Sequence, residues 1–353
     1  MTKKVDFGLR IMTRSRLRKD VLAIFRAGLK AVDPAAAVKR HVRRRGNILT
    51  VGPRSYDLKD YDGIYVIGAG KASAALAGPL EELLGGRLRS GIINVKSGHA
   101  RPLRRITVNE AGHPVPDEAG QRGTRQIMEL LSRTGEKDLV FVLLSGGGSA
   151  LLPAPAPGLT LEDKRQTTQR FLESGAAIQE INAVRKHISA VKGGRLARLA
   201  YPSALVSLIL SDVIGDSLES IASGPTVPDS TTFSDCLRIL QKYGITRKVP
   251  PAVRRYLEKG ARGKVEETPK ADDPAFIRTQ NLIVGSNIQA VLAAKNKAKA
   301  LGYNSLVLST TIEGETREIA GMHAALAREI LASGHPVRRP ACLISGGDRK
   351  SVV

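Results

Sequence analysis

The sequence predicts an α/β fold of two domains: a Rossmann-like, mostly parallel sheet with flanking helices, followed by a second α/β domain. Strand-like aliphatic runs alternate with helix-like segments along most of the 353 residues, and this alternation is typical of parallel sheets joined by crossover helices. Three of the runs end in loops rich in glycine or acidic residues, as expected at the carboxyl edge of such a sheet. The length suffices for two sizeable cores.

The apolar pattern places the elements of the first domain. A helix over 20–32 is expected because Leu22, Phe25, Leu29 and Val32 recur at helical spacing. The predicted strands are 64–68, 91–95, 105–109, 139–144 and 204–210. The predicted helices are 71–84, 119–133, 162–173, 178–191 and 216–222, the third of them starting with a capping box at Thr160 and Asp163.

A second α/β unit is predicted from Asn281 onward. Its expected elements are a strand at 281–285, a helix at 287–301, a strand at 305–309, a helix at 315–333 and a strand at 341–345. We therefore place an N-terminal domain at 1–235, a connecting segment at 236–275 and a C-terminal domain at 276–353. The connecting segment is charged and contains proline in its later half, and helices are possible over 235–258.

The most informative loop follows the predicted strand at 139–144, in which five of six residues are aliphatic. The next five residues are Ser145, Gly146, Gly147, Gly148 and Ser149. Bare backbone N–H groups in such a loop favour phosphate binding. A tight strand-to-helix turn is the alternative interpretation.

Gly70 and Lys71 follow the strand at 64–68 in a similar way. Ser73 replaces the third glycine of a dinucleotide-binding fingerprint, and the loop does not match a Walker A sequence. A helix N-terminus with small residues and one lysine can still bind an anion. The alternative is a solvated lysine on the first helical turn.

Two aspartates follow the strand at 204–210. Asp212 and Asp216 could hold Mg²⁺, orient a hydroxyl group or accept its proton. They could equally form a turn and a helix N-cap. Phosphate-binding loops and carboxylates at neighbouring strand ends are the parts that phosphoryl transfer requires.

A cationic segment over 180–195 precedes these aspartates. If it is helical, Asn182, Arg185, Lys186 and Ser189 share one face, and Lys192 follows at a glycine turn. We interpret the segment as an anion-binding face. The alternative is an ordinary amphipathic helix with a solvated basic face.

Several long motifs, in order, resemble the glycerate 2-kinase family with a C-terminal MOFRL domain, whose members are also called hydroxypyruvate reductases. They are VIGAGKASAAL, AGHPVPDEAG, LLSGGGSALL, INAVRKHISAVKGGRLA, SDVIGDSLESIASGPTVPD, IVGSN and TIEGE. The resemblance implies two α/β domains with the active site in the cleft between them. It also implies ATP-dependent phosphorylation of D-glycerate to 2-phosphoglycerate with a divalent cation, Mg²⁺.

The resemblance also implies roles for the residues that match the motifs. Lys71 would be a catalytic ligand of the phosphate or of the transferring group. Asp212 and Asp216 would bind the metal and accept the hydroxyl proton. The substrate- and phosphate-binding residues would be Gly70, Ser145, Gly146, Gly147, Gly148, Ser149, Asn182, Arg185, Lys192, Ser286, Asn287 and Glu313, the last three from the second domain.

The end of the chain departs from the family pattern. Asp348 stands where glutamate is usual, and the chain ends at Val353 without a GGRNQ segment, whose arginine is thought to act in catalysis. We therefore expect an incomplete second domain with exposed apolar surface and an unpaired sheet edge. A poor catalyst is the expected consequence.

Two rival functions stay open, and the first is a non-catalytic nucleotide or nucleic-acid binding protein. A formal charge of +22 suits a nucleic-acid binder, yet aromatic residues are 4% and tryptophan is absent, which disfavours base stacking. The other rival is a nicotinamide-dependent hydroxypyruvate reductase. Cys236 and Cys342 lack disulfide or zinc spacing, and no apolar run approaches the ~20 residues of a membrane span, so we expect a cytoplasmic protein. We interpret His113 and His187 as structural.

Overall fold

The structure is a computed structural model that describes residues 14–350. The contacts divide the chain into two compact units. The larger unit comprises residues 34–286, and the smaller unit comprises the described parts of residues 1–33 and 287–353. Each unit is an α/β assembly, in agreement with the predicted fold class.

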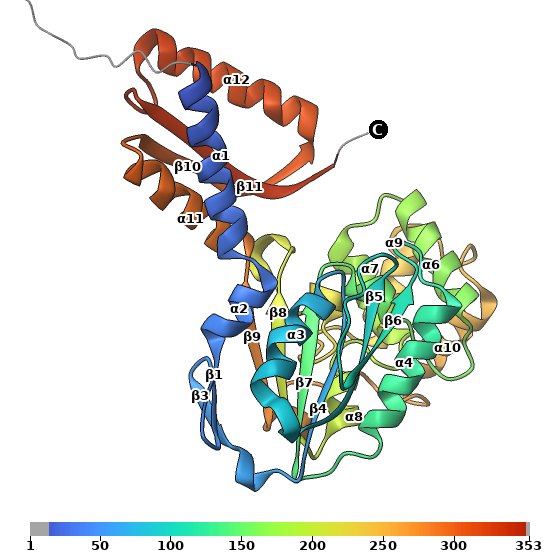
Figure 1. Cartoon of the computed structure of the whole chain (residues 1–353). Coiled ribbons are helices and arrows are strands. Elements are labelled where there is room, and N and C mark those ends of the chain that lie inside the picture. Colours follow the sequence, from blue (N-terminus) through green and yellow to red (C-terminus); the bar gives the residue numbers. More distant parts are fainter. Residues whose placement is uncertain (1–13, 351–353) are drawn as a thin grey trace, which may run out of the picture. The chain divides into compact units, whose positions relative to one another are not determined.

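A six-stranded parallel sheet forms the centre of the larger unit, in the order β6-β5-β4-β7-β8-β9 (Figure 1). The strands are β4 (Gly63–Ala69), β5 (Leu88–Lys96), β6 (Ile106–Ala111), β7 (Asp138–Ser145), β8 (Ala204–Leu210) and β9 (Thr279–Gly285). The chain adds strands on one side of β4 and then returns to add β7, β8 and β9 on the other. The loops after β4 and β7 therefore part at the switch point of the sheet, where open α/β folds bind ligands.

Both faces of this sheet are buried, which explains the continuous aliphatic runs. Phe141 and Leu143 of β7 pack with α3 on one face, whereas Val140 and Val142 pack with α4 and α8 on the other. The helices are α3 (Ser73–Leu84), α4 (Glu118–Leu131) and α8 (Arg195–Ala200). Successive side chains of a strand point to opposite faces, so a strand covered on both sides needs apolar residues throughout.

Four further helices form a separate apolar cluster in the larger unit. They are α6 (Leu161–Glu173), α7 (Ile178–His187), α9 (Phe233–Lys242) and α10 (Pro251–Ala261). The predicted capping box of α6 is present, because Thr160 accepts from the N–H of Asp163 and Asp163 accepts from that of Thr160. Helix α7 ends at His187, four residues before the predicted end, and a glycine-containing turn follows.

The sequence did not indicate an antiparallel sheet that follows α2 (Pro34–His41). Its strands are β1 (Val42–Arg45), β2 (Ile48–Val51) and β3 (Arg54–Asp57). The predicted helix at 216–222 is wrong, since the chain there forms two short 3-10 turns with Asp216 and Ala222 at positive φ. Left-handed backbone cannot continue a right-handed helix.

The smaller unit contains a two-stranded parallel sheet and three helices. They are α1 (Arg14–Ala31), α11 (Asn287–Ala300), β10 (Asn304–Glu315), α12 (Thr316–Ser333) and β11 (Ala341–Lys350). Gly28 lets α1 approach α11, because a Cβ there would lie 3.1 Å from the carbonyl of Ala290. Ile24 of α1 is buried, but Phe25 and Leu29, which we predicted as part of its apolar stripe, are 60% and 55% exposed.

These units differ from the predicted domain bounds of 1–235, 236–275 and 276–353. The strand at 281–285 is β9, which pairs with β8 in the large sheet rather than with the smaller unit. Helix α1 packs on α11, far away in sequence, and so belongs to the smaller unit. The segment predicted as a connection contains α9 and α10, whose apolar faces complete the larger unit.

Candidate active site at the switch point of the large sheet

The loops after β4 and β7 are joined directly at the switch point. The N–H of Lys71 donates to the carbonyl of Gly146 at 2.9 Å, and the N–H of Ala72 donates to the hydroxyl of Ser145 at 2.9 Å. Ser145 is buried, and its hydroxyl supports the start of α3. A Cβ on Gly70 would collide with that hydroxyl, so only glycine fits there.

Two side chains lie over the glycine turn after β7. A Cβ on Gly147 would lie 2.8 Å from Cδ2 of His113 and 3.3 Å from Cε of Lys71, so both side chains lie over this residue. Burial, followed by the charges of Lys71 and Lys96, lowers the pKa of His113, while Asp212 opposes the shift. The amino group of Lys71 makes no hydrogen bond or ion pair with any residue from 14 to 350.

Gly146 gives the carboxylate of Asp212 its place, since a Cβ on Gly146 would overlap with that carboxylate. We expect Gly146→Ala to displace Asp212, which is exposed and free to rotate, and to lower turnover by about 10-fold or more. Thermal stability should change little, since a mobile side chain gives way rather than backbone. Enzyme assays and melting curves of this variant and of Gly135→Ala, whose Cβ would meet no atom within 4 Å, separate the two effects. Equal losses in both variants would contradict the expectation.

A chain of hydroxyl and amide groups continues the site on the side of α7. Ser149 and Ser223 hydroxyls lie 2.8 Å apart, and Ser223 donates to Oδ1 of Asn182 at 3.2 Å. The ammonium of Lys192, which is 2% exposed, donates to the carbonyls of Ser149 at 2.9 Å and Ala222 at 3.3 Å. Lys192 thus fastens the glycine turn after β7 to the turn that follows β8.

Helix α7 is held in place by a buried charge network. Lys186 pairs with Asp229 at 3.1 Å and with Glu219 at 3.1 Å, and Nε2 of His187 lies 2.8 Å from Glu267. Lys186 therefore serves the fold and is not part of a solvated basic face. The structural interpretation of His187 agrees with this geometry.

Glu267 gives the stability of this network a pH dependence. Burial alone would raise its pKa, but hydrogen bonds from His187 and from the backbone N–H groups of Phe233 and Thr268 lower the pKa to about 2 from 4.5. Because this pKa is lower in the folded chain than in the unfolded chain, ionised Glu267 stabilises the fold above about pH 4.5. This stabilisation is lost as the pH falls toward 2. The free energy of unfolding, measured by denaturation at several pH values, should fall less steeply over this window in Glu267→Gln than in the unsubstituted chain. Parallel curves would argue against the assignment.

Comparison with known proteins decides the family. Residues 20–258 match the family model described as "Domain of unknown function (DUF4147)". The chain is 42% identical to a glycerate 2-kinase of Pyrococcus horikoshii over 332 residues, which cover 94% of this chain and 74% of that protein. The chain belongs to the glycerate 2-kinase family. A D-glycerate 2-kinase of Thermotoga maritima is 37% identical over 94% of this chain and 73% of its own length.

A solved structure of a member of the glycerate 2-kinase family has the same fold. The crystal structure of the Thermotoga maritima glycerate kinase matches with a TM-score of 0.80 at 37% identity, covering 96% of this chain and 75% of that one. The resemblance inferred from the motifs and the α/β class are thereby confirmed.

The structure does not bring together every residue that the family motifs suggested. Asp216, on its left-handed turn, makes no side-chain hydrogen bond or ion pair within the described chain. Ser286 is buried just after β9. Asn287 and Glu313 belong to the smaller unit, where Asn287 donates to the carbonyl of Thr310 at 2.7 Å and Glu313 is exposed on β10. Their roles stay predictions.

Two residues near the glycine turn were missed or misjudged from sequence. His113 lies against Gly147 rather than in a core. Lys96 ends β5 beside it, a placement that requires knowledge of the strand order. The position of Lys96 at a strand end was the available signal.

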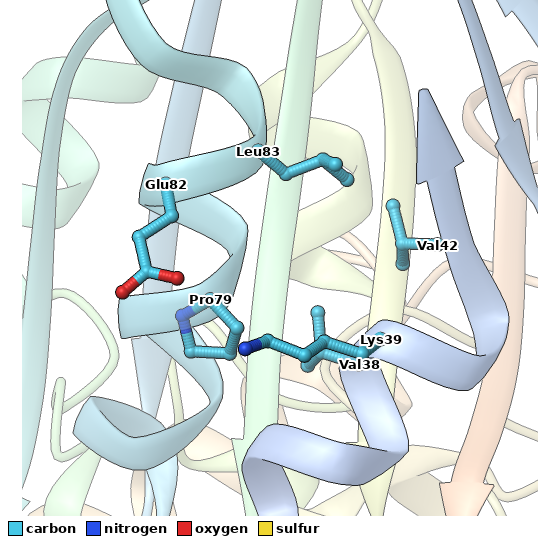
Figure 2. A pocket seen from close by; sticks show the side chains of 6 residues that line it. All are labelled: Val38, Lys39, Val42, Pro79, Glu82 and Leu83. Atoms are coloured by element: carbon cyan, nitrogen blue, oxygen red, sulfur yellow. The ribbon is translucent and has the colours of Figure 1, made fainter. Parts of the chain in front are cut away.

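A pocket of about 230 Å³ lies elsewhere in the larger unit, between α2 and α3 (Figure 2). It is lined by Val38, Lys39, Val42, Pro79, Glu82 and Leu83. Pro79, Glu82 and Leu83 belong to the second half of α3, about 9–15 Å along the helix from its first residue, Ser73. The pocket is therefore separate from the candidate active site.

None of the helices over residues 14–350 is both long and apolar enough to cross a bilayer.

Proposed function

We propose that the chain is a glycerate 2-kinase, which transfers the γ-phosphoryl group of ATP to the 2-hydroxyl of D-glycerate. The observation that carries this proposal is the meeting of Lys71, His113 and Asp212 around Gly146 and Gly147 at the switch point of the sheet, in a chain of the glycerate 2-kinase family. Phosphoryl transfer depends mainly on positioning and on neutralising charge, and this arrangement offers both.

The step requires a base, a cation and an oxyanion site. The 2-hydroxyl oxygen forms a bond to the γ-phosphorus, the bond from that phosphorus to the β–γ bridging oxygen breaks, and ADP leaves. The proton of the hydroxyl goes to Asp212, whose carboxylate has no partner among the described residues. Lys71 neutralises the charge on the transferring group. The N–H groups of Gly147 and Gly148, which donate no hydrogen bond within the described chain, face its oxygens.

The residues fit a divalent cation that arrives with the nucleotide. The described chain contains no group of three or more potential metal ligands among histidine, cysteine and acidic residues. Mg²⁺ is commonly held by one or two carboxylates, waters and substrate phosphates, and Asp212 supplies such a carboxylate. When bound, Mg²⁺ would neutralise phosphate charge. Asp216 remains our second candidate ligand.

The other candidate functions have less support. A nicotinamide-dependent reductase would need the third glycine of the fingerprint after β4, where Ser73 stands buried as the first residue of α3. Nucleic-acid binding rests on net charge alone, because aromatic residues are scarce.

An ADP-release assay with D-glycerate, ATP and Mg²⁺ tests the proposal, with ³¹P NMR to show whether the product carries phosphate at the 2-position. Calorimetric titration of D-glycerate and of ATP gives a second readout that needs no turnover. We expect ADP release that depends on D-glycerate. NADH oxidation with hydroxypyruvate in place of ADP release would refute the kinase assignment.

A further inference from the structure

Three basic side chains lie together in the larger unit, next to the glycine turn after β7, where Lys192 donates to the carbonyl of Ser149. Lys164 of α6 is 6% exposed and Lys192 is 2% exposed. Burial, with the charges of Arg185 and Arg195, lowers the pKa of Lys164 to about 7. Burial and the charges of Lys164 and Arg185 also lower the pKa of Lys192. Lys164, Arg185 and Lys192 therefore lie close enough to repel one another, and we call them the cationic cluster.

The cationic cluster has carbonyl partners but no acidic partner in the described chain. Lys164 donates to the carbonyl of Ile188 at 3.0 Å, and Lys192 donates to two other carbonyls. The guanidinium of Arg185 makes no hydrogen bond or ion pair with residues 14–350. By contrast, Lys186, next to Arg185 in sequence, is buried and paired with two carboxylates, as is usual for a buried cation.

Burial without an acidic partner disfavours the charged forms of these side chains, and a bound anion would restore them, so such a cluster suits an anionic ligand. Its place in the site indicates which anion. Lys192 bonds to Ser149, and Lys71 lies over Gly147, two residues earlier. Two residues span at most about 7 Å. D-glycerate carries its carboxylate on the same carbon as the 2-hydroxyl. The carboxylate must therefore lie beside the phosphoryl group whose charge Lys71 neutralises.

A carboxylate suits the cationic cluster better than the nucleotide triphosphate does. A triphosphate enters with a divalent cation, which seeks carboxylate oxygens, and none acts on these three cations in the described chain. Arg185 has a planar guanidinium that can bind both oxygens of a carboxylate. Asn182 adds an amide beside it on α7.

We propose that the cationic cluster binds the carboxylate of the hydroxy-acid substrate, with Arg185 in direct contact and Lys164 as a positioning residue that acts through Arg185. This inference rests on the proposed kinase function. The site then has two parts: the cationic cluster, which holds the substrate carboxylate and contains no acidic residue, and the surroundings of Asp212, where the phosphoryl group is transferred. It also explains a preference for hydroxy acids over uncharged polyols such as glycerol.

The test compares Lys164→Met and Arg185→Gln with Arg170→Met, a control on the exposed face of α6. At saturating ATP we expect the KM for D-glycerate to rise about 10-fold in Lys164→Met and about 10- to 100-fold in Arg185→Gln, the range for charge-assisted hydrogen bonds. The KM for ATP and kcat should stay within about 3-fold. Melting temperatures identify a variant that fails to fold, in which case Lys164→Gln and Arg185→Lys take its place.

Calorimetry with D-glycerate and with glycerol keeps this inference separate from the kinase assignment. A chain that binds D-glycerate, but not glycerol, and loses that binding in Arg185→Gln supports the inference even if turnover is absent, which would contradict only the kinase function. A rise in the KM for ATP with an unchanged KM for D-glycerate would overturn the inference and assign the cluster to phosphate. Loss of kcat alone would also overturn it.

Discussion

Lys71→Met should lower kcat/KM for D-glycerate by about 10²- to 10³-fold without changing the fold. This magnitude is typical when one group that stabilises developing charge is removed from an active site. Lys71 is suited to this role because its side chain lies over Gly147 and has no partner among the described residues. An amino group that makes no hydrogen bond or ion pair within the described residues contributes little to folding, so the melting temperature should be unchanged. Steady-state kinetics and melting curves check both statements.

Lys59→Met is the matched control for this experiment. Lys59 is exposed on a short turn before β4, away from the carboxyl edge of the sheet, and its substitution removes the same charge. The control should keep its activity within about 2-fold, because screened surface charges act weakly at a distance. Similar losses in the two variants would mean that net charge, rather than the position of Lys71, supports turnover.

Asp229→Ala should have the largest effect on stability, a loss of about 3–5 kcal/mol in the free energy of unfolding. That is the usual cost when the buried partner of an ion pair is removed, because Lys186 then keeps only Glu219, whose side chain is 44% exposed. Asp229 is fully buried, pairs with Lys186 at 3.1 Å, and accepts from the N–H and hydroxyl of Thr231 at 3.0 and 2.8 Å. Urea denaturation provides the measurement.

A double-mutant cycle with Lys186→Met tests whether the cost comes from the stranded cation. The double variant Asp229→Ala/Lys186→Met should be more stable than Asp229→Ala alone, because the buried ammonium is then gone. Thr231 loses its hydrogen bonds to Asp229 in both variants, so this loss cancels in the comparison. Additive losses from the two substitutions would show that Asp229 supports the backbone of its turn and not the charge of Lys186.

The strands of the large sheet were predictable because burial on both faces leaves a continuous aliphatic run. The run from Leu139 to Leu144 and that from Ala204 to Leu210 both became strands at almost the expected bounds. The helix expected at 216–222 failed, because apolar spacing does not reveal that Ala222 and Ser223 adopt positive φ. The antiparallel sheet over 42–57 was missed, since a run of arginines conceals its alternating pattern.

The candidate site was predictable only as far as strand ends could be recognised. Each loop after β4, β7 and β8 was recognised alone, and their meeting follows once the strand order is known. The approach of His113 to Gly147, and of Lys96 to His113, depends on which strands neighbour β4, which local spacing does not encode. The same holds for Lys164, whose helix packs against α7 through a cluster of long-range apolar contacts.

The turn after β8 limits how the glycine loop can vary in evolution. A Cβ on Gly148 would lie 2.9 Å from the Cβ of Ala222, so this corner has room for one methyl group. Ala222 occupies it in a left-handed conformation (φ 51°) that favours glycine. Substitutions at the two positions are therefore coupled. In a library randomised at both, each active clone should carry glycine in at least one of them, and drift at position 148 becomes possible only after glycine has replaced Ala222.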